Sequence, residues 1–563
     1  MGAGDADVPA VRELGVVADA LERLSFGLSG TSAAELRTER DRVVRLLRGV
    51  LARSATPHAP LLVVVAGGTG AGKSTTVNSL AGRGVTATGV VRPTTRVATL
   101  VCHPQDRDWF ADDRVLPGLV RVEEPAAGTL RGDQLALSTS PALPAGIALV
   151  DTPDVDSVER HNRVVAERAL DAADVWLWLA TARTYADEVG MTYLRRARDR
   201  QALTAIAITQ LRGPEDAEVL ADVARVHVAE GVEPDRTVAI AHAEVVDDRL
   251  PAEVVADLNA WLTELAPADR RERVRGDALR GLRAAVPAEL TPIAHAVEHE
   301  LEVADRLLAR VAGRFARIGE QLDEELEAGL SLRSEVLERW RQLVGGNELL
   351  LKVQSSAEQL GGVVRDRLGL RSRDHVRQVQ GEIADELTRT VERLLEQAAA
   401  RVRRDLESDP VGRDLLDRHP RLRATGTERE GAVRRTITEW QAHAATLVDE
   451  VGGRRKVRAR RLTTALNATA TTAILVLFTV SGGLTTGEVG IAAGAAAASQ
   501  WLLTRLLGEQ NVKRLLEEIQ ADLRERVERL AAAERLPVED VIGAAAPPAA
   551  VVATVRDTAG RRP

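Results

Sequence analysis

The sequence predicts an α/β domain with a mostly parallel sheet, followed by a long α-helical bundle or stalk with a C-terminal two-segment apolar hairpin. Three observations predict this architecture. Between residues 57 and 267, short apolar runs alternate with helical segments. Beyond residue 267 the strand signals stop, and apolar residues recur at the three- and four-residue spacing of helices. Residues 462–480 then form an uncharged stretch of 19 residues directly after a basic cluster.

Length and composition exclude several classes of protein. A chain of 563 residues is too long for one ordinary core, so we expect two or more structural units. A net charge of -8 gives no general attraction for nucleic acid, and aromatic residues make up only 2% of the chain. The single cysteine, Cys102, excludes intramolecular disulfides and fits a reducing cytoplasm. The first residues lack the basic and apolar regions of a secretory signal peptide.

We expect five segments along the chain. Residues 1–56 carry helices with a break near residues 27–31, and residues 57–267 form the α/β domain. Its apolar runs, which predict strands buried on both faces, are 61–66, 97–102, 146–150, 175–179, 205–209 and 237–241.

The second half of the chain is predicted to be helical. Residues 268–453 form a bundle or stalk whose segment 292–322 has a coiled-coil-like seam. Residues 454–508 contain the basic flank and the apolar hairpin, with basic residues at both outer ends and a Gly-rich tip. In residues 509–563 a helix is followed by an Ala/Pro-rich tail that the composition predicts to be flexible.

A phosphate-binding loop is the strongest motif of the chain. Its residues, which match the Walker A pattern, are Gly67, Gly68, Thr69, Gly70, Ala71, Gly72, Lys73, Ser74 and Thr75. An apolar strand precedes this loop and a helix follows it, as the motif requires. Glycines let backbone N–H groups converge on phosphates, Lys73 supplies positive charge, and the Ser74 hydroxyl is suited to ligate Mg²⁺. The motif predicts a P-loop nucleotide hydrolase.

A second motif ends the predicted strand 146–150. Asp151 follows this strand directly, where a carboxylate can hold Mg²⁺ in the nucleotide complex. The Asp-Thr-Pro sequence is the form common among GTP-hydrolysing P-loop proteins, whereas transporter ATPases usually have Glu after this Asp. A glycine normally occupies the position of Asp154, and the phosphates would repel the Asp154 carboxylate unless it is turned away from them.

Two further loops contribute predicted nucleotide contacts. The loop before strand 97–102 contains Thr95 and Thr94, and we expect Thr95 to close over Mg²⁺ and the γ-phosphate, with Thr94 as the second choice. Thr209 and Gln210 occupy the position of the base-contacting loop. Arg212 stands there where guanine recognition usually places an aspartate, and it cannot accept the guanine N–H bonds. The choice between GTP and ATP therefore stays open at this loop.

With these motifs in this order, the chain resembles the bacterial dynamin-like proteins, a family of large GTPases. The resemblance rests on residues 67–75, 92–96 and 151–154, together with the hairpin 462–503, and its tract 151–158 is similar to an actinobacterial branch. It implies GTP as the substrate and Mg²⁺ as the cofactor. Hydrolysis in this family uses a polar residue of the phosphate loop, and Thr69 stands at that position instead of the usual glutamine, which implies slow turnover. The catalytic residues implied are thus Lys73, Thr95 and Thr69.

The resemblance also implies a function at membranes. We expect self-association into dimers or higher oligomers, and binding, tethering or remodelling of membranes at the cytoplasmic face of the cell membrane. The basic cluster 454–461 beside an apolar span favours anionic lipid as a partner over nucleic acid. Two alternatives remain: a membrane-anchored nucleotide switch or scaffold that does not remodel lipid, and an ATP-dependent transporter subunit. The latter needs a signature after the phosphate loop, whereas the only similar stretch, at Leu28, precedes it.

Overall fold

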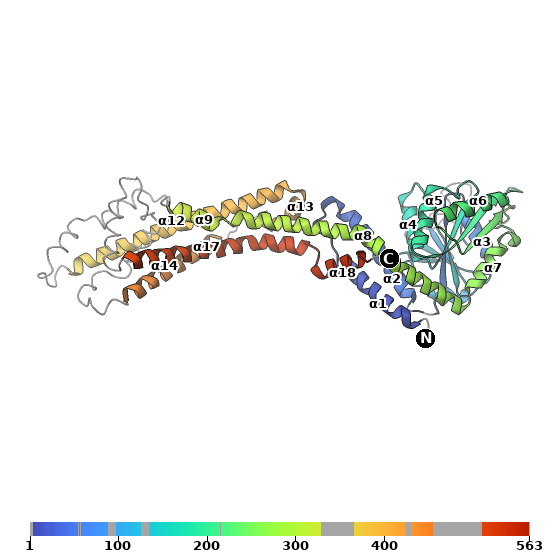
Figure 1. The fold of residues 1–563 in the computed structure, drawn as a ribbon, viewed down its shortest axis with the longest axis horizontal. Coiled ribbons are helices and arrows are strands. Elements are labelled where there is room, and N and C mark those ends of the chain that lie inside the picture. The colour runs from blue at the N-terminus through green and yellow to red at the C-terminus, as the bar shows by residue number, and fades with distance from the viewer. Residues whose placement is uncertain are drawn as a thin grey trace. The chain divides into compact units, whose positions relative to one another are not determined.

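The fold is described by a computed structural model of the chain (Figure 1). It describes residues 4–54, 56, 58–87, 97–124, 134–213, 216–327, 365–423, 429–453 and 509–561. The chain divides into two compact units, of which unit 1 comprises residues 1–300 and 547–563 and unit 2 residues 301–546. Thr94, Thr95 and the predicted hairpin 462–503 lie outside the described residues.

Unit 1 is built on one sheet of 8 strands in the order β3-β4-β2-β5-β1-β6-β7-β8. The strands are β1 Leu61–Gly67, β2 Ala98–Cys102, β3 Val120–Glu123, β4 Gln134–Thr139, β5 Ile147–Asp151, β6 Val175–Thr181, β7 Leu203–Leu211 and β8 Arg236–Ala241. Every neighbouring pair is parallel except β2 with β5, which is antiparallel. The predicted mostly parallel α/β domain is confirmed.

Strand β1 lies in the middle of the sheet, and its two faces are both covered. Because side chains alternate along a strand, Leu62 and Val64 point into one apolar core and Leu61 and Val63 into the other. Helices α4 (Arg160–Ala172), α5 (Glu188–Asp199) and α6 (Asp216–Ala229) contribute to the first core. Helices α3 (Lys73–Leu80) and α7 (Ala256–Leu265) contribute to the second. This double coverage explains why the strand is apolar throughout.

The apolar pattern of the sequence does not predict two of the strands, β3 and β4. Strand β3 lies at the edge of the sheet, and its residues from Val120 to Glu123 are exposed or half-buried. An edge strand with one solvated side lacks the continuous apolar run that predicts the central strands.

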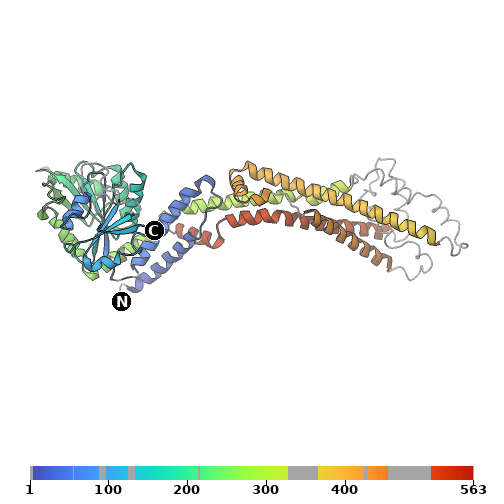
Figure 2. The same cartoon turned by 180° about the vertical axis from the view of Figure 1, so that it is seen from behind.

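The N-terminal helices belong to unit 1. Helix α1 (Gly4–Glu22) packs against α2 (Ala33–Ser54) and against α18 (Ala549–Ala559), as Figure 2 shows from behind. The composition predicts a flexible tail after residue 533, but this prediction is wrong. Helix α17 continues to Ala545, and α18 buries Val551 and Val555 in unit 1. Valines at this spacing form an apolar face that outweighs the Ala/Pro-rich composition around it.

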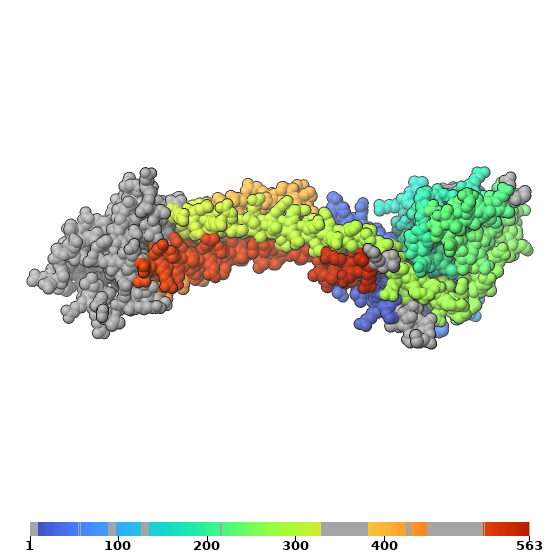
Figure 3. All heavy atoms as spheres, viewed as in Figure 1, coloured from blue at the N-terminus to red at the C-terminus, as the bar shows by residue number. Residues whose placement is uncertain are grey.

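Unit 2 consists of long helices. It contains the C-terminal end of α8 (Ala268–Phe315), then α9 (Ile318–Glu327), α12 (Arg365–Ser408), α13 (Pro410–Arg418), η4 (Pro420–Arg423), α14 (Arg429–Gly453) and α17 (Glu509–Ala545). Figure 3 shows α8 and α17 exposed on one face of this unit. The Trp440 indole on α14 is fully buried and donates a hydrogen bond of 3.0 Å to the Ile519 carbonyl oxygen of α17. The predicted helical bundle is thus present in the described residues.

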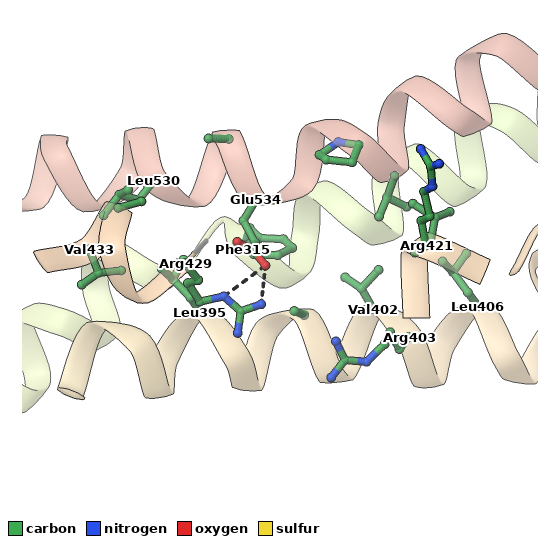
Figure 4. Close-up of a pocket in the computed structure, with 16 residues that line it drawn as sticks. Phe315, Leu395, Val402, Arg403, Leu406, Arg421, Arg429, Val433, Leu530 and Glu534 are labelled. Carbon is green, nitrogen blue, oxygen red and sulfur yellow. Dashed lines mark hydrogen bonds and ion pairs between the residues drawn. The ribbon is translucent and has the colours of Figure 1, made fainter. Parts of the chain in front are cut away.

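A cavity of about 320 Å³ lies within unit 2 (Figure 4). Phe315, Val402, Val433 and other apolar side chains line it. Beside it the guanidinium of Arg429, whose side chain is only 9% exposed, pairs with both Glu396 of α12 and Glu534 of α17. One buried arginine therefore ties three helices together around the cavity.

One described segment, Lys513–Ala559, has the length and apolar composition of a membrane span, with a mean hydropathy of 1.4 over its best window. This is weak support for a span. The segment is interrupted between Ala545 and Ala549, and the apolar residues of α18 are buried in unit 1. We therefore assign α18 to the core of unit 1.

Candidate nucleotide-binding site

The phosphate-binding loop connects the carboxyl end of β1 to the start of α3 at Lys73. Gly70 and Gly72 have left-handed φ angles of 78° and 85°, which glycine adopts without strain. At Gly67 a Cβ atom would collide with the carbonyl oxygen of Leu179 on the neighbouring strand β6. These three glycines are thus required by backbone conformation and by close packing against the sheet.

The side chain of Lys73 extends back across this loop. Its side chain is only 5% exposed, and its Nζ donates hydrogen bonds to the carbonyl oxygens of Gly67 (3.0 Å) and Gly68 (3.1 Å). The same ammonium forms an ion pair with the Asp154 carboxylate. The lysine is therefore buried inside the loop, where its charge is screened little by solvent.

The Asp154 carboxylate is directed towards the phosphate loop. Asp154 follows strand β5 by three residues, and its side chain points to Lys73. The half-buried carboxylate is attracted by the nearest ammonium group, that of Lys73. This attraction determines the orientation seen here.

The carboxylate of Asp151 forms the second part of the site. It is fully buried at the end of β5, and its Oδ2 accepts hydrogen bonds from Ser74 Oγ (2.7 Å) and Thr86 Oγ1 (2.8 Å). Its other oxygen, Oδ1, is buried without a hydrogen-bond partner. Burial raises the pKa of Asp151, while the bonds from Ser74 and Thr86 and the charge of Lys73 act in the opposite direction.

These groups suit Mg²⁺. The ion prefers oxygen ligands, keeps part of its water shell and is usually held by one or two carboxylates together with substrate phosphates. Asp151 Oδ1 and Ser74 Oγ are oxygens of this kind. Within the described ranges no group of three or more His, Cys, Asp or Glu residues could hold a metal by itself. The donor set fits a metal that binds together with a nucleotide.

Thr209 and Gln210 hold the loop from the side of β7. Thr209 Oγ1 donates a hydrogen bond of 2.9 Å to the carbonyl oxygen of Ala71, and Gln210 Nε2 donates one of 2.9 Å to that of Gly70. Gln210 has a left-handed φ of 61°. The sheet therefore brings both predicted residues to the loop, where they contact its backbone.

Two residues of the site were not predicted. Thr86 bonds to Asp151, and the Asp156 carboxylate accepts hydrogen bonds from Thr69 N (2.9 Å) and Thr69 Oγ1 (2.7 Å). The sequence offers one indication for Asp156, because it is, after Asp154, the second acidic residue in the turn that follows Asp151. For Thr86 the sequence offers no comparable signal, because the residue lies in a loop of ordinary composition.

A strand, a glycine loop and a helix that place a buried lysine beside a strand-end aspartate define a P-loop nucleotide hydrolase. Residues 63–211 of the chain match the model of the Dynamin family, so this part of unit 1 is a dynamin-family domain. Members of this family are GTPases, and the chain is accordingly a GTP-hydrolysing enzyme.

Solved structures with a similar fold are distant. One is an oligomerised bacterial dynamin pair described as sensing and tethering membranes, at 12% identity over 98% of this chain and 95% of that chain, with a TM-score of 0.40. LeoA, a bacterial dynamin GTPase from ETEC, is 12% identical over 99% of both chains, with a TM-score of 0.23. Era in complex with MgGDPNP and 16S ribosomal RNA is 16% identical over 36% of this chain and 57% of that chain, with a TM-score of 0.24. Similarity at this level carries no functional conclusion. No curated protein matches the chain.

Proposed function

We propose that this chain binds GTP with Mg²⁺, hydrolyses it slowly, and couples this cycle to membrane binding, tethering or remodelling through self-association. The observation that carries the nucleotide part is the buried Lys73 in the glycine loop, followed by Ser74, whose hydroxyl donates a hydrogen bond to the strand-end carboxylate of Asp151. Lys73 then binds the β- and γ-phosphates, while Ser74, Asp151 and Thr95 hold the metal and Thr69 assists hydrolysis. Membership of an actinobacterial branch of the bacterial dynamins is part of the same proposal.

Electrostatics support the Mg²⁺ requirement. Three carboxylates contact the phosphate loop. Asp151 accepts a hydrogen bond from Ser74, Asp156 accepts one from Thr69, and Asp154 forms an ion pair with Lys73. Lys73 is the one lysine or arginine of that loop. A triphosphate entering this environment would meet a net negative charge, which a bound divalent cation offsets.

The first test is nucleotide binding and hydrolysis by the full chain. With Mg²⁺ we expect a fluorescent GTP analogue to bind and to be displaced by GTP but not by a tenfold excess of ATP. Removal of Mg²⁺ with EDTA is expected to weaken binding about a hundredfold, because the three carboxylates then repel the phosphates. Equal displacement by ATP would contradict the guanine preference and favour an ATP-dependent enzyme.

The second test concerns the membrane. Six basic residues between positions 454 and 461 precede the uncharged stretch 462–480, and each contributes about 1 kcal/mol of attraction to an anionic surface. We expect the full chain to float with phosphatidylserine vesicles, and a variant lacking residues 454–503, that is both the basic cluster and the apolar hairpin, to remain in the soluble fraction while still binding Mg²⁺-GTP. Flotation of the deletion variant would show that the anchor lies elsewhere.

The same vesicles separate lipid remodelling from a membrane-anchored switch. We expect GTP to cause clustering or deformation of vesicles carrying the full chain, seen by electron microscopy, and GDP to cause none. Binding without any change of the vesicles in GTP would favour the switch or scaffold.

A further inference from the structure

Two acidic side chains of one short segment bind the groups that a phosphate-binding loop offers to phosphate. Asp156 Oδ1 accepts hydrogen bonds from the Thr69 backbone N–H and hydroxyl, and Oδ2 lies 3.1 Å from the same nitrogen. Two residues earlier, Asp154 forms the ion pair with Lys73. Between them the two carboxylates bind a loop N–H group, a loop hydroxyl and the loop ammonium.

These contacts have the chemistry of phosphate binding. An ionised carboxylate is acceptor-only, and its bonds with an ammonium or an N–H group are charge-assisted, as are those of a phosphate oxygen. A donor saturated by a carboxylate is not available to a second anion, and two anions at the same donors repel each other. A nucleotide must therefore release these carboxylates in order to bind Thr69 and Lys73.

The two contacts differ in the phosphate with which they compete. Lys73 begins α3, whose N-terminus receives the inner phosphates, and its Nζ serves the β- and γ-phosphates. Thr69 lies four residues earlier, on the side of the loop next to strand β1, and is thus nearer the outermost phosphate. Competition at Lys73 affects any nucleotide with a β-phosphate, whereas competition at Thr69 affects the triphosphate most.

We propose that Asp156 is an internal competitor for the γ-phosphate and sets the relative affinity of the site for nucleoside triphosphate and diphosphate. This inference rests on the proposed GTP site. Asp156 is solvent-exposed, so release of its carboxylate from Thr69 requires no unfolding of the core. Asp154 acts in the same way at Lys73, but its replacement also alters the surroundings of the buried ammonium. Asp156 therefore gives the cleaner test.

The experiment measures the affinity of the full chain for GDP and for a non-hydrolysable GTP analogue in Mg²⁺. We expect Asp156→Ala to bind the triphosphate analogue about tenfold more tightly, since the protein no longer loses charge-assisted hydrogen bonds when the nucleotide enters. Affinity for GDP should change by less than about threefold on the same reasoning. Asp156→Asn, which keeps an acceptor but no charge, should lie between wild type and Asp156→Ala.

Glu159→Ala is the matched control. It removes the same charge three residues further along the chain, where the side chain is exposed and makes no capping hydrogen bond at the start of α4. We expect its affinities to stay within about twofold of wild type. The buried Cys102 reports that each variant is folded, because burial raises the pKa of its thiol to about 12 and the native sheet excludes alkylating reagents.

The outcomes separate the two proposals. If the wild type binds the analogue and Asp156→Ala binds it with equal or lower affinity, the competitor role is wrong and Asp156 instead supports the loop. Equal tightening by Glu159→Ala would overturn the inference too, since it would reduce the effect to general charge. If folded wild-type protein binds neither GTP nor GDP, the proposed function itself fails.

Discussion

Replacement of Lys73 by alanine is expected to weaken Mg²⁺-GTP binding by at least about a hundredfold, because a buried charge-assisted contact to two phosphates is lost. The structure adds a second reason. Without the ammonium, the Asp154 carboxylate loses its partner, and it then stands with Asp151 as an uncompensated negative charge beside the phosphates. Isothermal titration calorimetry of the full chain measures the change directly.

Lys513→Ala is the control for this experiment. Its side chain is 74% exposed on α17, and its ion-pair partner Glu517 lies one helical turn away at 4.0 Å. A pair of this kind contributes little, so we expect unchanged binding. Micromolar binding retained by a folded Lys73→Ala protein would reject the assignment of the phosphate loop.

The second large effect is expected at Glu289, in a buried ion network within unit 1. Its carboxylate pairs with Arg42 of α2 and, at 2.7 Å, with Arg200 at the end of α5. Arg200 also contacts Asp171 of α4 at 2.9 Å. We expect Glu289→Gln to lower the free energy of unfolding of this unit by about 3 kcal/mol, because Arg42 and Arg200 each lose one anionic partner and keep another, Glu39 and Asp171 respectively. Urea unfolding at pH 7, followed through the exposure of Cys102 to alkylation, measures this loss.

The same carboxylate predicts a pH dependence. Burial alone would raise the pKa of Glu289, but Arg200 and Arg42 outweigh it and hold the pKa at about 2, below the ordinary 4.5. The stabilisation is therefore complete above pH 4.5 and is lost as the pH falls towards 2. The lowered pKa of Glu289 corresponds to about 3 kcal/mol of stabilisation of the folded state. Far-UV circular dichroism should show a steeper loss of stability across this range in wild type than in Glu289→Gln.

Glu298→Gln, on the same helix α8, is the matched control for Glu289→Gln. Glu298 pairs with Arg556 at 3.5 Å, and both side chains are about half exposed, at 49% and 59%. A solvent-exposed pair contributes at most about 1 kcal/mol. An equal effect of the two substitutions would show that burial of the network does not determine its contribution.

The sequence predicts the parts of the site that are contiguous in the chain. The loop from Gly67 to Ser74 needs only a strand before it and a helix after it, and β1 and α3 supply both. The antiparallel pairing of β2 with β5 was not predictable, because either strand direction buries the same apolar residues. Thr95 and the hairpin 462–503 remain predictions, since they lie outside the described residues.

Contacts between distant residues required the structure. Asp156 meets Thr69 across 87 positions of sequence, and Thr86 meets Asp151 across 65. Neither contact can be predicted from a local pattern, because the sequence does not show whether a polar residue in a loop faces solvent or a hydrogen-bond partner. The buried network at Glu289 was likewise hidden, since helix α8 carries charged residues along its whole length and their periodicity does not show which one is buried.

The sequence by itself determined the phosphate-binding loop, the central strands and the helical second half, since backbone conformation and side-chain periodicity are encoded by neighbouring residues. Only the tertiary structure decided the strand order, the packing of α18 in unit 1 and the position of the two carboxylates at the loop. The physical reason is that burial and pairing of charge depend on which segments the sheet brings together. At Lys73, the sheet brings the Asp154 carboxylate into an ion pair with the ammonium group that we propose binds phosphate.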